Sequence, residues 1–264
     1  MSDPFEGKRY VVTGASSGFG EAYAQALHAR GASVILVARR KNRLHKLSQK
    51  LNAVRAHSAE IFPADLSDES SSSGGLRELE EFLREERVDG LINNAGFGSY
   101  GRFSDAATEV ASAMIRVNVI APLRLTKAVL PQMKQRNFGI IVHVASVAAF
   151  QPLPYMATYA ATKSAICSLA LSQHHELKSE NIHVLAVCPG PVKTEFGQVA
   201  QFPGEFGGTI GDSIQSVIQD TIRGIERKKV LIFPGFAGKI LGLSSRLCPP
   251  QISIPLLERL IRPK

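Results

Sequence analysis

The feature that most constrains the fold of this chain is a regular alternation of apolar, strand-like runs with segments of helical length. The strand-like runs cover residues 9–13, 33–38, 54–62, 88–93, 139–145, 183–187 and 230–233. The helical segments cover residues 21–30, 41–51, 76–86, 106–136, 159–177 and 212–227. Such alternation predicts a parallel sheet with helices on both faces, because right-handed crossovers place them there. We therefore predict an α/β protein with a doubly wound parallel sheet in a single domain, residues 1–235, followed by an extension, residues 236–264.

The composition is that of a globular domain that folds without disulfides or metals. Of the 264 residues, 44% are hydrophobic and 20% are charged, which is close to the average for such domains. The three cysteines are odd in number and show no C-x-x-C spacing, so we expect a reducing, cytoplasmic compartment. The first ten residues contain no apolar run of the kind found in secretory signals, and none is therefore expected here.

Neither a membrane span nor a nucleic-acid site is predicted. Residues 137–162 contain no Lys, Arg, Asp or Glu. However, Pro152, Pro154 and several hydroxyl groups interrupt them, whereas a spanning helix needs ~20 predominantly apolar residues. The net charge is +8, yet the basic residues are scattered and no nucleic-acid-binding motif accompanies them. The positive charge instead suits a protein that attracts an anionic cofactor.

The segment TGASSGFG, residues 13–20, follows the first predicted strand and opens the first predicted helix. Its glycines have the spacing G-x-x-x-G-x-G at Gly14, Gly18 and Gly20, not the commoner G-x-G-x-x-G. Glycines let the chain turn sharply and let a pyrophosphate approach the backbone, and the following helix N-terminus offers N–H groups to an anion. The segment predicts a dinucleotide-binding loop, although in isolation a purely structural turn would have the same pattern.

The second predicted strand indicates which dinucleotide binds. An acidic residue after this strand would bind the ribose 2′-hydroxyl of NAD, but this chain has Arg39 and Arg40 there. A guanidinium suits a 2′-phosphate through bidentate, charge-assisted hydrogen bonds. We therefore predict NADP(H) rather than NAD(H); the alternative is that the arginines only form the exposed start of a helix.

A candidate catalytic set follows the fifth predicted strand. Tyr159 and Lys163 are spaced to share one face of a helix, and a nearby ammonium makes a tyrosine, with its usual pKa of ~10, useful for proton transfer. Ser146 lies at the end of the strand, where α/β proteins bind their ligands. A Y-x-x-x-K pair alone is weak, since helices often carry one by chance. Tyr155, for comparison, has no lysine at the corresponding position.

Together, these motifs resemble those of the short-chain dehydrogenase/reductase family, over residues 6–233. The matching segments are TGASSGFG, Asp65-Leu66, NNAG at 93–96, Asn118 in RVNVIAP, Ser146, YAATK at 159–163 and PGPVKT at 189–194. They follow the family's order, and the features of its longer, extended members are absent. The resemblance implies a Rossmann-like fold, hydride transfer between NADP(H) and a small-molecule carbonyl or alcohol, and a homodimer or homotetramer built on the helices at 106–136 and 159–177.

The resemblance also implies a role for each matching residue. Tyr159 is the general acid for carbonyl reduction and the base for alcohol oxidation, and Lys163 lowers its pKa and binds the nicotinamide ribose. Ser146 orients the carbonyl, and Asn118 maintains a proton-relay water. The implied cofactor-binding residues are Gly14, Ser16, Ser17, Phe19, Gly20, Arg39, Arg40, Asp65, Leu66, Asn94, Tyr159, Lys163, Pro189, Gly190, Val192 and Thr194. No metal site is predicted, because no H-E-x-x-H pattern is present among the seven histidines.

Substrate choice is expected to depend on three loops rich in Phe, Pro, Gly and Leu, at 97–103, 147–156 and 196–212. Phe196, Phe202 and Phe206 suit an apolar lid that excludes water during hydride transfer, although they also suit simple packing of the loop. With a lid, the substrate has an apolar body, such as a ketoacyl chain, a steroid or another lipophilic ketone or aldehyde. A sugar or polyol dehydrogenase is an alternative, as is a cofactor-sensing binding protein without turnover, which would not need a complete Ser–Tyr–Lys set.

The extension at 236–264 alternates apolar and basic residues, a pattern that also occurs in peripheral membrane anchors. Pro249, Pro250 and Pro255 are expected to break any long helix in it. Packing over the cleft or against another subunit is therefore predicted in preference to membrane contact.

Overall fold

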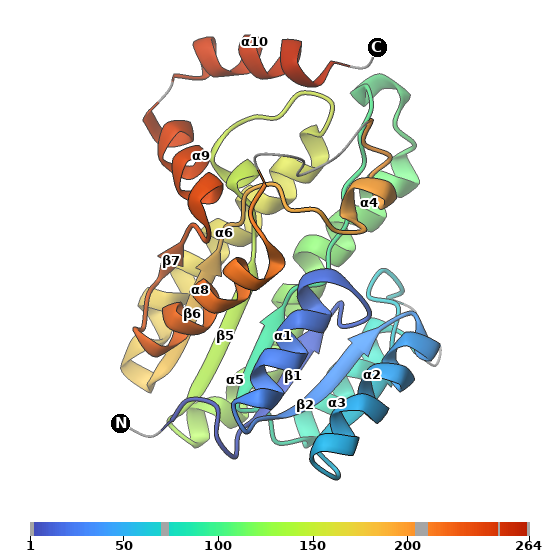
Figure 1. Ribbon diagram of the computed structural model, residues 1–264, viewed down its shortest axis with the longest axis vertical. Coiled ribbons are helices and arrows are strands. Elements are labelled where there is room, and N and C mark those ends of the chain that lie inside the picture. Colours follow the sequence, from blue (N-terminus) through green and yellow to red (C-terminus); the bar gives the residue numbers. More distant parts are fainter. Residues whose placement is uncertain (1–2, 70–73, 204–210, 248, 263–264) are drawn as a thin grey trace.

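The computed structural model describes residues 3–69, 74–203, 211–247 and 249–262. Within them, seven parallel strands form one sheet in the order β3-β2-β1-β4-β5-β6-β7 (Figure 1). The strands are β1 (Arg9–Thr13), β2 (Ser33–Ala38), β3 (Ala59–Pro63), β4 (Gly90–Asn93), β5 (Gly139–Val144), β6 (Ile182–Val187) and β7 (Leu231–Ile232). The strand order reverses between β1 and β4, which defines a doubly wound sheet with a ligand crevice at that point. The predicted fold class is confirmed.

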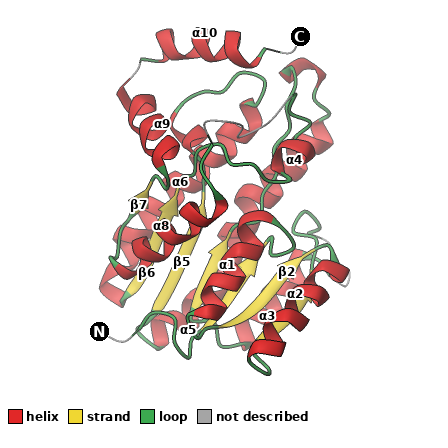
Figure 2. Ribbon diagram, in the orientation of Figure 1, coloured by secondary structure: helices red, strands yellow, loops and turns green. Residues whose placement is uncertain are grey.

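Helices cover both faces of the sheet (Figure 2). One face packs against α1 (Gly18–Ala29), α2 (Lys41–Val54) and α8 (Ile214–Glu226). The other packs against α3 (Leu76–Glu85), α5 (Ala121–Gln135) and α6 (Ala157–Leu177). Along β2, Val34 and Leu36 belong to the first core and Ile35 and Val37 to the second. This double burial explains why the strands are continuous apolar runs in the sequence.

Two segments differ from their predicted form. Residues 54–62 were expected to be one strand, but α2 continues to Val54, whose side chain is 79% exposed, and β3 begins at Ala59. The β-branched side chain suggested a strand, whereas the apolar stripe of α2 extends through its last turns. The segment 106–136 contains α4 (Thr108–Ile115), a π-helix at Arg116–Ile120 and then α5. The π turn is centred on Asn118, whose side chain has tertiary partners described below.

The extension forms two further helices, α9 (Phe236–Leu247) and α10 (Pro250–Ile261). They lie beyond the carboxyl ends of the strands, at the end of the molecule opposite the N-terminus (Figure 1). Pro250 occupies the first turn of α10, where its missing N–H is harmless. Pro255 was expected to break any long helix, but it lies inside α10, where it is exposed. No helix among the described residues is long and apolar enough to cross a bilayer.

Candidate active site

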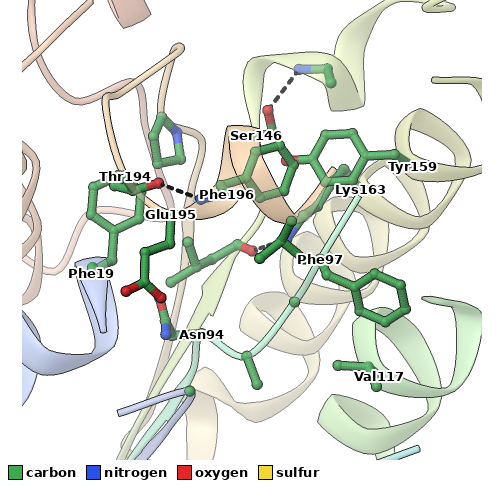
Figure 3. Close-up of a pocket in the computed structure, with 18 of the residues that line it drawn as sticks. Phe19, Asn94, Phe97, Val117, Ser146, Tyr159, Lys163, Thr194, Glu195 and Phe196 are labelled. Carbon is green, nitrogen blue, oxygen red and sulfur yellow. Dashed lines mark hydrogen bonds between the residues drawn. The ribbon is translucent and has the colours of Figure 1, made fainter. Parts of the chain in front are cut away.

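A cavity of about 680 Å³ opens at the carboxyl ends of the central strands. Figure 3 shows Phe19 and Asn94 toward one end of it and Ser146 and Tyr159 toward the other. The predicted residues that line it are Gly14, Ser16, Ser17, Phe19, Arg39, Arg40, Asp65, Leu66, Asn94, Ser146, Tyr159, Lys163, Pro189, Gly190, Val192 and Thr194. Gly20 and Asn118 lie behind its wall. The structure thus brings into one cavity motifs that are far apart in the chain.

The glycine loop forms one wall of the cavity with bare backbone. Gly14 has φ +69° and Gly18 has φ +56°, in the left-handed region that favours glycine. A Cβ atom at Gly14 would lie 2.8 Å from Asn94 Nδ2, and one at Gly20 would lie 2.1 Å from Gly14 O. Gly20 therefore lets α1 pack closely against the loop. The loop and the N-terminus of α1 together form a cradle of the kind that accepts a pyrophosphate.

Hydrogen bonds fix this loop against the end of β4. Thr13 Oγ1 accepts hydrogen bonds from the N–H groups of Asn94 and Ala95, each at 3.0 Å. Asn94 Nδ2 donates to Thr13 O at 2.8 Å. The first part of the predicted NNAG motif thereby supports the glycine loop directly.

The arginines after β2 divide into two environments. Arg40 points to the glycine loop, where its Nε donates to Ser16 Oγ at 3.0 Å and its Nη2 donates to Ser17 Oγ at 2.6 Å. The side chain of Arg39 is 70% exposed, and its Nη1 lies 3.8 Å from Asp65 Oδ2. Arg40 is therefore the better placed of the two to meet an anion above the glycine loop.

Two residues absent from the predicted site complete this charged end. Glu195 accepts hydrogen bonds from Arg40 Nη1 at 2.7 Å and from Arg43 Nη1 at 2.6 Å. These two guanidinium groups lower the pKa of Glu195 to about 2. Arg43 had a sequence signal, because it lies one helical turn after Arg40. Glu195 had none, since its partners are more than 150 positions away in the chain.

The candidate catalytic side chains converge from β5 and α6. Ser146 follows β5, and its Oγ accepts a hydrogen bond from the N–H of Ala148 at 3.1 Å. Tyr159 and Lys163 lie on α6 with exposed fractions of 8% and 5%. Lys163 Nζ donates to Val144 O at 2.8 Å and lies 5.7 Å from the centroid of the Tyr159 ring. A hydroxyl, a phenol and an amine therefore come together in a largely buried part of the cavity.

Burial sets the protonation of this group. Desolvation raises the pKa of Tyr159 to about 12, against a hydrogen bond with Ser146 that lowers it. Desolvation lowers the pKa of Lys163 to about 8. At neutral pH Tyr159 therefore keeps its proton, whereas the pKa of Lys163 lies close to neutral pH. Such displaced pKa values in a cleft are typical of acid–base sites.

Asn118 lies behind the cavity and holds its wall together. Its Oδ1 accepts from the N–H of Phe97 at 3.1 Å, and its Nδ2 donates to Phe97 O and Thr162 Oγ1, both at 3.0 Å. A Cβ atom at Gly96 would lie 3.1 Å from Asn118 Oδ1 and 3.4 Å from Lys163 Nζ. Asn118 and Lys163 thus approach each other across the backbone of Gly96.

Beyond Tyr159 the cavity becomes apolar. The ring of Phe196 lies 5.2 Å from that of Tyr159, centroid to centroid. The side chains that line this chamber are those of Phe97, Val117, Leu153, Met156, Phe196, Val199, Phe202, Leu241, Leu257 and Ile261. Six of them come from the three loops that the sequence singled out for substrate choice. Phe206, also named there, lies outside the described residues.

The last three chamber residues come from α9 and α10, which belong to the extension that was expected to pack over the cleft or against another subunit. Hydrogen bonds tie α10 to the chamber rim. Tyr100 Oη donates to Ile261 O at 2.5 Å, and Tyr155 Oη donates to Glu258 Oε1 at 2.5 Å. These bonds hold α10 as the roof of the chamber.

The fold and the cavity define a dinucleotide-binding oxidoreductase. Residues 8–201 match the family model described as short chain dehydrogenase. The chain belongs to the short-chain dehydrogenase/reductase family, as its motifs had indicated.

Individual relatives agree with this assignment. An uncharacterized oxidoreductase of Staphylococcus epidermidis is 34% identical over 192 residues, which cover 73% of this chain and 81% of that protein. The short-chain dehydrogenase from Sphingobium yanoikuyae in complex with NADPH has a TM-score of 0.77 at 32% identity, over 85% of this chain and 86% of that one. The bulky-bulky ketone specific alcohol dehydrogenase from Comamonas testosteroni has a TM-score of 0.75 at 30% identity, over 85% and 84%. A nicotinamide cofactor is therefore supported.

Proposed function

We propose that this protein is an NADP(H)-dependent oxidoreductase that interconverts a lipophilic ketone or aldehyde with its alcohol. One observation carries the proposal: Ser146, Tyr159 and Lys163 lie in a single cavity between an arginine-bearing cradle and an apolar chamber. A binding protein without turnover would not need this complete set of proton-handling side chains. The set therefore favours an enzyme.

The charged end of the cavity fits NADP(H). The bare backbone at Gly14 and the N-terminus of α1 would hold the pyrophosphate. Arg40, with Arg43, would hold the 2′-phosphate, and residues 189–194 would cover the nicotinamide. When bound, the dinucleotide supplies or accepts the hydride. The NADPH complex of the Sphingobium relative supports this choice.

The chain's own residues handle the proton. In reduction, the Ser146 hydroxyl orients the carbonyl oxygen, and Tyr159 Oη, which is protonated at neutral pH, donates its proton to that oxygen. The Lys163 ammonium then stabilises the phenolate that remains. It has three N–H donors and uses one of them on Val144 O. In alcohol oxidation the same groups act in the reverse direction.

The chamber favours a substrate with an apolar body. Its walls combine aromatic and aliphatic side chains from the loops with those of α9 and α10. The hydroxyl groups of a sugar or polyol would lose their hydration there with few partners in return, which is costly. Similarity to an enzyme described as specific for bulky-bulky ketones supports the same class of substrate.

We also propose a homodimer or homotetramer. The exposed apolar side chains Val110 and Ile115 on α4, 42% and 45% exposed, lie within the segment that the family resemblance assigns to subunit contacts. Light scattering after gel filtration tests this proposal.

A panel of carbonyls and alcohols, followed by the absorbance of NADPH, tests the proposed activity. Tyr159→Phe should reduce turnover by at least about 100-fold, because it removes the transferred proton, while NADPH binding is retained. Tyr10→Phe is the matched control. Tyr10 lies near the start of β1, away from the cavity, and its hydroxyl donates to Pro4 O. Retained turnover in Tyr159→Phe would refute the catalytic assignment. NADH binding as tight as NADPH binding in fluorescence titrations would refute the cofactor assignment.

A further inference from the structure

The carboxylate of Glu195 occupies the point where two guanidinium groups converge. Each of its oxygens accepts one hydrogen bond, from Arg40 Nη1 at 2.7 Å and from Arg43 Nη1 at 2.6 Å. Glu195 comes from the loop after β6, whereas both arginines follow β2. Two arginine side chains on one planar or tetrahedral oxyanion is the usual arrangement for a carboxylate or a phosphate. The protein therefore supplies its own anion to this site.

Arg40 uses three of its five N–H donors in this arrangement. Its Nε and Nη2 groups hold Ser16 and Ser17 of the glycine loop, and its Nη1 holds Glu195. A second anion at the same guanidinium competes with the Glu195 carboxylate for the side of Arg40 that carries Nη1. A phosphate of charge about −1.5 to −2 and a carboxylate a few ångströms apart also repel each other.

We propose that Glu195 is a specificity-determining residue that fills the 2′-phosphate site of the free protein and is displaced when NADP(H) binds. This inference rests on the proposed use of NADP(H) and concerns the free-energy cost of binding its 2′-phosphate. Binding NADPH then includes the loss of two ion pairs. Binding NADH, which has no 2′-phosphate, leaves these pairs closed.

Displacement of Glu195 by the 2′-phosphate would also affect the substrate chamber, because Glu195 directly precedes α7 (Phe196–Val199). The N–H of Phe196 donates to Thr194 Oγ1 at 3.2 Å, and its ring packs on Tyr159. Release of Glu195 therefore removes one of the two contacts that anchor this segment, while Phe196 stays packed on Tyr159. In the free protein the same ion pairs hold that wall in place.

Neutralising Glu195 should shift cofactor preference. The side chains of Glu195 and Arg40 are 39% and 43% exposed, so each ion pair is screened by solvent and contributes at most about fivefold to an equilibrium. Glu195→Gln removes both pairs and the repulsion toward phosphate. We expect NADPH to bind about five- to twentyfold more tightly, and NADH to change by less than about twofold.

Calorimetric titration of the whole protein with NADPH, NADH, adenosine 2′,5′-bisphosphate and ADP tests the inference without turnover. Glu226→Gln is the matched control: Glu226 pairs with Arg30 at 2.5 Å with similar exposures of 35% and 40%, at the opposite edge of the sheet. Only Glu195→Gln should tighten binding, and only for the two ligands that carry a 2′-phosphate.

The outcomes separate this inference from the proposed cofactor. An unchanged or weakened NADPH affinity in Glu195→Gln, or equal tightening for NADH, overturns the displacement. A wild-type protein that binds NADH as tightly as NADPH contradicts the proposed cofactor preference. In that case the displacement still stands if Glu195→Gln shifts the ratio of the two affinities toward NADPH, and it fails if the ratio stays constant.

Discussion

Gly96→Ala should slow catalysis while leaving the fold intact, because Gly96 separates two parts of the proton-handling group. The added Cβ would lie 3.1 Å from Asn118 Oδ1 and 3.4 Å from Lys163 Nζ. Asn118 yields little, since three hydrogen bonds hold its amide. Residue 96 itself would therefore have to move by a few tenths of an ångström to relieve the 3.1 Å contact, and we expect this movement to crowd Lys163, whose ammonium is held by Val144 O.

The size of this effect follows from the geometry. A shift of about 1 Å in a catalytic group costs on the order of 100-fold in rate, so a third of that shift should cost about fivefold, or about 0.9 kcal/mol in the barrier. We expect kcat/KM to fall by that factor. The free energy of unfolding, measured with urea, should change by less than about 1 kcal/mol, because the strain is local.

Gly98→Ala provides a contrast from the same loop. Its Cβ would lie 2.7 Å from Phe196 Cζ and 3.1 Å from Met156 Cε, both at the ends of chamber side chains. It should raise KM for bulky substrates and leave kcat for small ones close to that of the wild type. Equal kinetic effects of the two substitutions, or full activity in Gly96→Ala, would show that Gly96 does not position Lys163.

Two further predictions concern pH. Burial lowers the pKa of Lys163 to about 8, and kcat/KM reports the ionisations of the free enzyme. We therefore expect kcat/KM for carbonyl reduction to fall as the pH rises through about 8. A Lys163→Met variant should be slow and should lack this transition. His143 is fully buried, and desolvation lowers its pKa from 6.5 to about 4. At pH values between about 4 and 6.5, the imidazole of His143 is protonated in the unfolded chain but not in the folded one. The free energy of unfolding therefore falls as the pH falls through this range. From pH 6.5 to 5 this linkage costs about 2 kcal/mol. In urea unfolding at pH 6.5 and pH 5, the free energy of unfolding of His143→Gln should fall by about 2 kcal/mol less than that of the wild type. An equal loss in the two proteins would disprove the linkage.

The sheet could be predicted from the sequence because both of its faces are buried. Apolar runs such as 33–38 are continuous for that reason, and they match β2 residue for residue. Helix ends were less predictable. Val54 ends α2 although its side chain favours strands, since the periodicity of Leu44, Leu47 and Leu51 outweighs a local preference.

The motifs around the cavity could be located for a related reason. In a doubly wound fold, the carboxyl ends of parallel strands meet at one edge, so residues after successive strands become neighbours. Ser146 and the glycine loop follow β5 and β1 and do share a cavity. The pairing of Glu195 with Arg43 follows no such rule, because it depends on how the loop after β6 folds back across the crevice. The orientation of α10, which brings Leu257 over the chamber, likewise depends on tertiary contacts alone.

The loop that follows β6 has a different kind of contact at each end of the cavity. Toward the glycine loop, Glu195 forms solvent-exposed ion pairs, which salt screens. Toward the chamber, Phe196 packs on Tyr159 and buried apolar neighbours, and this contact is insensitive to salt. A charged ligand at one end can therefore release the loop while the other end keeps its register. Because residues 189–194 directly precede these two anchors, this part of the loop is positioned to respond to the cofactor without exposing the tyrosine to water.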